Sequence, residues 1–167
     1  MTRRWKVYAW VAALVVVADQ LTKLLARSAL PVDAAGSGIR IPVIRDFFDL
    51  VLARNTGAAF SLLARTGGTR IILTLFGLVA IAGITWMVRR ARDDQIWLVA
   101  ALALMAGGAV GNLIDRILFG RVTDFVLWHW HDHTWPVFNL ADACLSVAIA
   151  VFAANAASTL WRARKFA

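Results

Sequence analysis

The sequence predicts an all-α membrane protein with four transmembrane helices. Its 167 residues are 60% hydrophobic and only 17% charged, a balance that soluble domains of this size seldom reach. The chain contains four apolar stretches, each long enough as a helix to cross a hydrocarbon core of roughly 30 Å. These stretches cover about 7–26, 71–88, 95–114 and 137–161. The length suits one domain, so we expect residues 1–167 to form a single integral membrane domain.

The basic residues predict how these helices are oriented. Nine of the 18 Lys and Arg residues lie in three clusters beside apolar stretches, which is typical of transmembrane topology rather than of a nucleic-acid surface. The clusters are Arg3, Arg4 and Lys6, then Arg89, Arg90 and Arg92, and finally Arg162, Arg164 and Lys165. They place both termini and the 89–94 turn on the cytoplasmic side, with about 27–70 and 115–136 outside. We expect no nucleic-acid partner.

The first outer segment is predicted to have structure of its own. Residues 41–53, IPVIRDFFDLVLA, are rich in β-branched and aromatic residues and are bounded by turn-forming Gly and Pro. This pattern predicts a small extracytoplasmic β-sheet. After it, residues 58–64 are expected to form a short interfacial helix. The first apolar stretch, about 7–26, contains Asp19 and Lys23 and has no small-residue cleavage site. We therefore expect a retained span rather than a cleaved signal peptide.

Asp19 and Lys23 are ionisable residues inside an apolar helix, where such groups are costly and usually mark function. Their i, i+4 spacing puts them on one helix face, where they can pair. Counted from Lys6, Asp19 lies about 20 Å along the helix, in its outer half. The two residues are expected either to lock the helix as an ion pair or to take a direct part in chemistry.

The third span ends with the sequence GGAVGNLIDR. Gly107 and Gly111 form a small-xxx-small face that allows helices to approach closely. Asn112, Asp115 and Arg116 share one side of the same helix at its outer end. Asp115 and Arg116 are either an interfacial ion pair or part of a polar site.

The fourth span begins with FNLAD, in which Asn139 is a candidate N-cap and Asp142 lies three residues on, at the spacing of a capping box. Asp142 could therefore be no more than a capping acid. Its position in the fold favours a site instead, because seven polar residues map to the outer membrane boundary of this apolar chain. They are Asp19, Asn55, Asn112, Asp115, Asp124, Asn139 and Asp142.

Asp124 lies in VTDF, an outer segment that we expect to be extended. Two carboxylates in a site of low dielectric titrate unequally, because like charges at close range cannot both ionise cheaply. One then keeps a proton while the other holds a water, which suits general acid–base attack on an amide. The dipole of the fourth helix favours the anion of Asp142.

Five motifs in order along nearly the whole chain resemble those of bacterial lipoprotein signal peptidases, also called signal peptidase II. They are DQLTK (19–23), NTGAAFS (55–61), GGAVGNLIDR (107–116), VTDF (122–125) and FNLADA (138–143). The resemblance implies an aspartic endopeptidase of the bacterial cytoplasmic (inner) membrane. It implies a diacylglyceryl prolipoprotein substrate, cut just before the lipidated cysteine, and inhibition by globomycin. It implies no metal and no other cofactor.

The same resemblance assigns roles to residues. Asp124 and Asp142 correspond to the catalytic aspartates of the family. Residues expected to bind substrate or support the pair are Asp19, Lys23, Asn55, Gly57, Asn112, Asp115, Arg116, Asn139 and Ala141. Thr123 stands where many relatives have Val, an exchange expected to leave Asp124 in place. We expect a monomer whose only other partner is membrane lipid, with its active site at the outer leaflet boundary.

Three other functions fit parts of the sequence. His129, His131 and His133 alternate beside Asp132 and would share one face of a strand, as in a zinc site, although HExxH is absent. A small transporter could relay protons through its intramembrane aspartates, although internal repeats are not visible. A lipoprotein-binding module without catalysis is the third possibility.

Overall fold

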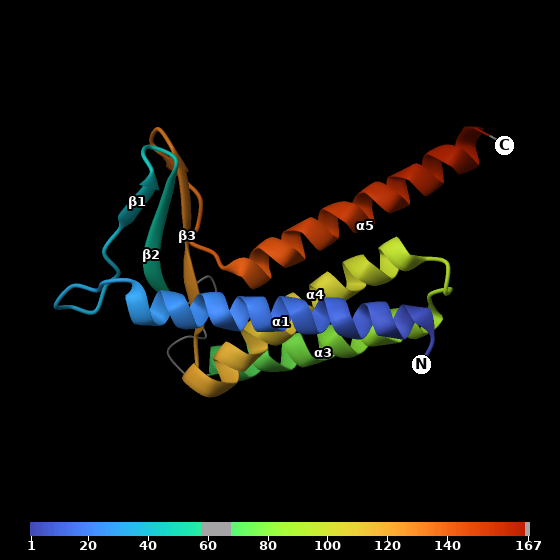
Figure 1. The fold of residues 1–167 in the computed structure, drawn as a ribbon, viewed down its shortest axis with the longest axis horizontal. Coiled ribbons are helices and arrows are strands. Elements are labelled where there is room, and N and C mark those ends of the chain that lie inside the picture. Colours follow the sequence, from blue (N-terminus) through green and yellow to red (C-terminus); the bar gives the residue numbers. More distant parts are fainter. Residues whose placement is uncertain (58–67, 166–167) are drawn as a thin grey trace.

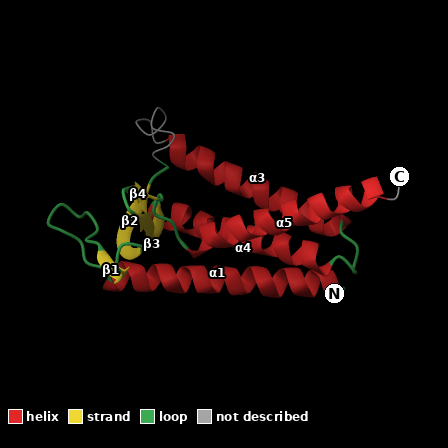
Figure 2. Cartoon of the chain, turned by 90° about the horizontal axis from the view of Figure 1, so that it is seen from above, coloured by secondary structure: helices red, strands yellow, loops and turns green. Residues whose placement is uncertain are grey.

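The structure is a computed structural model that describes residues 1–57 and 68–165 (Figure 1). Its helices are α1 (Arg3–Ala29), α3 (Gly68–Arg90), α4 (Ile96–Phe119) and α5 (Leu140–Lys165). Its strands are β1 (Ile41–Ile44), β2 (Phe48–Asn55), β3 (Val122–Trp130) and β4 (His133–Thr134). The start of α1 and the end of α5 lie at one end of the helices, and the strands lie at the opposite end (Figures 1 and 2).

Three of these helices, α1, α3 and α4, are long and apolar enough to cross a membrane. The described apolar part of α5, Leu140–Asn155, is shorter than such a span. Large apolar side chains project from the outside of the helices, a surface that suits lipid rather than water. Examples are Leu14, Val17, Leu25, Ile71, Phe76 and Val79. In the described part of the chain the structure therefore confirms four helices, of which three meet the length and composition of a span.

The predicted β-sheet is confirmed. It contains more strands than the two that come from the segment between α1 and α3. Its order is β1-β2-β3-β4, all antiparallel, so the segment after α4 supplies two of its strands. Ala53 of β2 is paired with Asp124 of β3, which places the VTDF motif within the sheet. The predicted interfacial helix at residues 58–64 lies outside the described part of the chain.

α4 is the central helix and packs against α1, α3 and α5. Two neighbouring glycines allow this close packing. A Cβ at Gly107 would lie 2.7 Å from the Cβ of Val15 in α1, and one at Gly108 would lie 2.7 Å from the backbone oxygen of Ala141 in α5. A Cβ at Gly111 would collide with the carboxylate of Asp19. The predicted packing face of Gly107 and Gly111 is confirmed, and Gly108 adds a second face that the sequence analysis missed.

Candidate active site

The fold brings the two motifs VTDF and FNLAD together through backbone pairing. After β4 the chain turns back beside β3, where Phe138 forms an antiparallel bridge with Val126. The amide of Phe138 donates to the Val126 oxygen at 3.0 Å, and the amide of Val126 donates to the Phe138 oxygen at 2.9 Å. α5 begins two residues later, so its first turn lies beside Asp124. The helix begins at Leu140, directly after the predicted N-cap Asn139, although the apolar stretch starts at about residue 137; the pairing with β3 explains this later start.

Asp124 and Asp142 are bound to the same residue, Asn139. The side-chain amide of Asn139 donates to Asp124 Oδ1 at 2.7 Å, and its backbone amide donates to Asp142 Oδ2 at 3.3 Å. Asn55 donates to the other oxygen of Asp124 at 3.0 Å, and Asn112 donates to Asp142 Oδ1 at 2.8 Å. The two carboxylates therefore lie on one side of the fold, each held by two donors.

The capping box predicted at the start of α5 is confirmed. The Asp142 amide donates to Asn139 Oδ1 at 3.0 Å, while the Asp142 carboxylate accepts from the Asn139 amide. The backbone amide of Ala141, also in this first turn, donates to Asp19 Oδ1 of α1 at 3.0 Å. Asp142 is thus a capping acid and a member of the polar cluster at once.

Beneath the two aspartates lies a buried ionic cluster. Lys23 Nζ lies 2.8 Å from Asp19 Oδ2 and 3.8 Å from Asp115 Oδ2, and all three side chains are 0% exposed. Lys23 also donates to Asn112 Oδ1 at 2.8 Å, so the cluster is joined to the residue that holds Asp142. The predicted pairing of Asp19 with Lys23 is confirmed. Gln20, which the sequence analysis did not single out, donates to Asp19 Oδ2 at 3.2 Å and to Asp115 Oδ1 at 3.3 Å.

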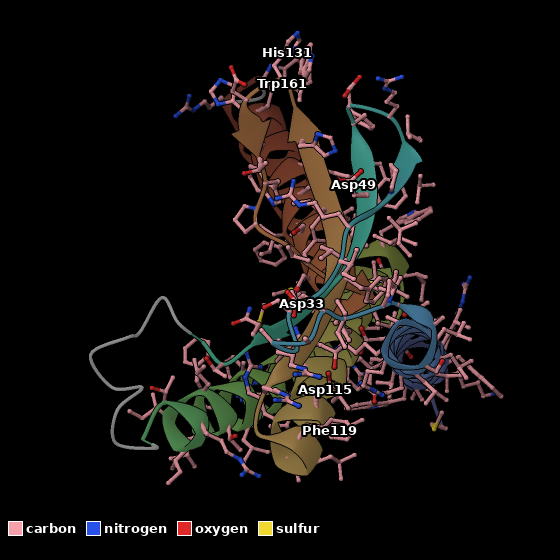
Figure 3. The ribbon with its side chains drawn as sticks, turned by 90° about the vertical axis from the view of Figure 1, so that its left-hand side faces the viewer. Asp33, Asp49, Asp115, Phe119, His131 and Trp161 are labelled. Atoms are coloured by element: carbon pink, nitrogen blue, oxygen red, sulfur yellow. The ribbon has the colours of Figure 1, made fainter. Side chains whose placement is uncertain are left out.

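Asp115 and Arg116 do not form the interfacial pair that was one of the sequence alternatives. Asp115 is buried and points toward α1, where its ion-pair partners are Lys23 and Arg27. Figure 3 shows Asp115 and Phe119 on α4 near the end of the helix. Arg116 is half-buried on another side of the helix, within electrostatic range of Asp142 and Asp124. Adjacent residues of a helix point about 100° apart, so the two side chains separate, and the structure supports the other alternative, a polar site.

The environment of Asp124 favours its protonated form. Burial, aided by the charge of Asp142, raises the pKa of Asp124 from its ordinary value of 3.8 to about 6, against the effect of hydrogen bonds from Asn55 and Asn139. Only 2% of this residue is exposed. The pair therefore has the unequal environments that general acid–base catalysis requires.

A cavity of about 310 Å³ opens beside Asp142. Its lining residues are Trp128, Trp135, Phe138, Asp142, Ala143, Ser146 and Val147. Asp142 supplies the only charge in this lining, because the other members are aromatic, aliphatic or hydroxyl side chains. The cavity can accept an apolar chain while its carboxylate faces a polar bond of that chain.

Gly57 follows the strand that carries Asn55 and fixes the orientation of that asparagine. Its amide donates to Asn55 Oδ1 at 2.8 Å, which leaves the Asn55 amide group to face Asp124. Gly57 has a φ of +82°, and a Cβ there would lie 2.5 Å from a side-chain carbon of Leu73. A residue with a side chain would therefore be strained at this position.

The three histidines do not form the shared face on which the zinc alternative depends. β3 ends at Trp130, and His131 has a φ of +53° in the turn to β4, so the alternation is broken. His129 Nε2 lies 3.2 Å from Asp49 Oδ2 on β2, an ion-pair distance without hydrogen-bond geometry. Figure 3 shows His131 at the tip of the sheet, far from Asp115. Within residues 1–57 and 68–165 no group of three His, Cys, Asp or Glu side chains is arranged to hold a metal.

Comparison with known proteins identifies the family. Residues 11–157 match the profile of a protein family described as Signal peptidase (SPase) II. The chain belongs to the signal peptidase II family of aspartic peptidases. Similar proteins include the lipoprotein signal peptidase of Syntrophotalea carbinolica, which is 41% identical over 87% of this chain and 88% of that protein. The lipoprotein signal peptidase of Pseudomonas putida is 43% identical over 86% of this chain and 82% of its own length.

Solved structures agree with this assignment. A bacterial membrane enzyme determined at 1.9 Å resolution superposes with a TM-score of 0.79 and is 26% identical, covering 89% of this chain and 90% of its own. A second, determined at 2.3 Å, gives a TM-score of 0.77 at the same identity. The predicted family, enzyme class and bacterial membrane location are thereby confirmed.

Proposed function

We propose that this signal peptidase removes signal peptides from diacylglyceryl-modified prolipoproteins, with Asp124 and Asp142 as the catalytic pair. Membership of the family supports the general reaction, the removal of signal peptides from prolipoproteins. The observation that carries the catalytic assignment is the shared donor: Asn139 binds both carboxylates, at 2.7 Å and 3.3 Å. An aspartic peptidase needs two such groups facing one water.

The reaction follows from the unequal environments of the two acids. Asp142 lies in the first turn of α5 and lines the cavity, so its carboxylate accepts the proton of the attacking water. The water oxygen forms a bond to the scissile carbonyl carbon while Asp124, whose pKa is raised, protonates the carbonyl oxygen. In the collapse, Asp142 gives its proton to the leaving nitrogen and the C–N bond breaks. A hydroxyl of the intermediate returns a proton to Asp124 as the new carboxyl group forms, so both aspartates regain their starting states.

The arrangement suits a substrate anchored in a bilayer. The diacylglyceryl group must stay in lipid while the scissile amide reaches water. We place the two aspartates at the outer leaflet boundary of the cytoplasmic membrane, with α5 as the fourth span and both termini in the cytoplasm. The sheet, which lies at the end opposite the termini, is then extracytoplasmic (Figure 1). The exposed Trp128, Trp130 and Trp135 suit the membrane–water interface there.

The cavity beside Asp142 is the proposed site for the chain that is cut before the lipidated cysteine. Its aromatic and aliphatic lining fits an apolar signal peptide, and Asp142 is placed against the peptide bond. Globomycin is expected to inhibit by occupying this site. The enzyme acts as a single-domain monomer whose residues supply the chemistry without a metal.

The test is a cleavage assay on a lipidated precursor. Loss of the signal peptide is detected as a shift of the precursor band on a gel. Asp124→Asn and Asp142→Asn are expected to fold and insert but to release no signal peptide. Asp49→Asn is the matched control, because Asp49 is a buried aspartate of the same sheet that pairs with His129. Full cleavage by either of the first two variants contradicts the assignment, and loss of activity on chelation contradicts the metal-free mechanism.

A further inference from the structure

Arg27 lies near the sheet end of α1 and has no part in the reaction described above. Its Nη1 donates a 3.0 Å hydrogen bond to Thr123 Oγ1 and lies 3.5 Å from Asp115 Oδ1. Its guanidinium carbon lies 4.8 Å from the centre of the Phe119 ring. The Arg27 side chain is 26% exposed, whereas Asp115 is completely buried. A single guanidinium thus joins α1, the last turn of α4 and the start of β3.

Thr123 is the residue before Asp124, and each of its polar groups has a partner from a different element. Its amide donates to Asp115 Oδ2 at 2.8 Å, its hydroxyl accepts from Arg27, and its carbonyl oxygen accepts from Asn139 at 3.3 Å. The peptide that leads into Asp124 is therefore held from α4, α1 and the cap of α5 together. A shift of Thr123 would move Asp124 with it, because the two share a peptide bond.

We propose that Arg27 is a positioning residue for the catalytic pair, acting on Asp124 through Thr123 and Asp115. This role rests on the proposed function, because it assumes that Asp124 is catalytic. The planar guanidinium can meet a hydroxyl and a carboxylate at once, which the point charge of a lysine does less well. A displacement of about 1 Å at a reacting group can cost about 100-fold in rate. Contacts that fix the backbone beside Asp124 therefore act on kcat rather than on substrate binding.

The experiment compares kcat and KM on a lipidated precursor for the full-length chain in detergent micelles. Arg27→Met is expected to lower kcat about tenfold while KM changes less than about twofold. Arg27→Lys should recover part of the loss, because an ammonium can still pair with Asp115. Arg70→Met is the matched control: Arg70 donates to the Ile117 oxygen at 2.8 Å near the same end of α4, with no contact to Thr123 among the bonds described. It should keep the wild-type kcat.

A double-mutant cycle separates positioning from general stabilisation. Thr123→Val removes the hydroxyl that accepts from Arg27 but keeps the β-branched shape. Because Val is expected to leave Asp124 in place, the fall in kcat should be small, about threefold, and less than that of Arg27→Met. If Arg27 acts through that hydroxyl, Arg27→Met must cost less in the Thr123→Val background than in the wild type. If the losses in kcat from the two single variants multiply in the double variant, the proposal is overturned. A wild-type kcat in Arg27→Met, or a kcat that only follows the folded fraction, would also overturn it.

Two further comparisons keep the result unambiguous. If Arg27→Met does not fold, Thr123→Val decides, and full kcat in that variant overturns the proposal. Asp124→Asn reports on the function itself. Cleavage by Asp124→Asn would overturn the catalytic assignment, whereas an inactive Asp124→Asn beside a fully active Arg27→Met would overturn only the role of Arg27.

Discussion

Asn139→Ala is expected to destabilise the fold and to disturb the proposed catalytic pair, Asp124 and Asp142. The side chain is completely buried and its amide group lies 2.7 Å from Asp124 Oδ1 and 3.1 Å from Asn112 Oδ1. Its oxygen accepts the amide of Asp142 at 3.0 Å. Alanine removes all of these contacts while it leaves the backbone amide that donates to Asp142. The change therefore separates the side-chain contribution of Asn139 from that of the helix itself.

The expected loss of stability can be worked from those contacts. Removal of an N-cap costs about 1 kcal/mol. A hydrogen bond to a charged group contributes about 1.5–3 kcal/mol, and the bond to buried Asp124 is of this kind. The effect is moderated because Asp124 keeps its bond from Asn55, and Asn112 keeps its bond from Lys23. We expect a loss of about 3 kcal/mol in the free energy of unfolding, which is a large fraction of the usual 5–15 kcal/mol.

Two measurements test this reasoning. Denaturant unfolding in detergent micelles gives the loss of stability, and cleavage of a lipidated precursor gives kcat, which should fall about 100-fold. Asn55→Ala is the comparison: it removes one bond to Asp124 without touching the cap, so it should destabilise less. An Asn139→Ala variant that unfolds at the wild-type denaturant concentration, or that keeps its kcat, would refute the shared-donor description of the site.

Three other perturbations have defined outcomes. Burial raises the pKa of Asp124 to about 6, so the folded chain binds this proton more tightly than the unfolded chain, and the stability it contributes is lost as pH rises from about 4 through 6. Unfolding midpoints at pH 4.5 and pH 7.5 should therefore differ less in Asp124→Asn than in the wild type; equal differences contradict the shift. Gly107→Ala should destabilise by about 1–3 kcal/mol because its Cβ would lie 2.7 Å from that of Val15. Gly83→Ala, where a Cβ meets nothing within 4 Å, should be neutral or stabilising by thermal unfolding. Lys23→Met leaves Asp19 buried without its cation and should cost about 3–5 kcal/mol, so an unchanged unfolding midpoint would contradict the buried pair.

The features that the sequence predicts best are local ones. The pairing of Asp19 with Lys23 and the capping box of Asn139 with Asp142 depend only on helical spacing, and both are confirmed. The small-residue face of Gly107 is of the same kind. In each case the period of the helix fixes which side chains meet, so no knowledge of the tertiary fold is needed.

The contacts that the sequence could not give are those between segments far apart in the chain. Asn55 reaches Asp124 because the register of β2 and β3 shifts between Leu50 and Ala53, after which Ala53 pairs with Asp124. A further shift of one residue would turn Asp124 to the other face. Asp115 meets Arg27 and not Arg116 because α4 packs on α1 at that point. One signal for Arg27 was present, since it continues the i, i+4 series of Asp19 and Lys23 on the same face of α1. The histidine alternation, kept only as an alternative, does not form one face because the turn at His131 breaks the strand.

The charges around the site explain why this chain keeps so many ionisable groups in an apolar bundle. Asp19, Lys23, Asp115 and Arg27 are two anions and two cations in mutual contact, so this supporting cluster is nearly neutral. The proposed catalytic pair therefore adjoins a cluster that helps to fix its geometry and adds little net charge. After burial, the largest influences on the pKa of Asp124 are the hydrogen bond from Asn55, which lowers it, and then the charge of Asp142, which raises it. A neutral support of this kind permits two carboxylates to share one proton, which a site with an excess of buried cations would prevent.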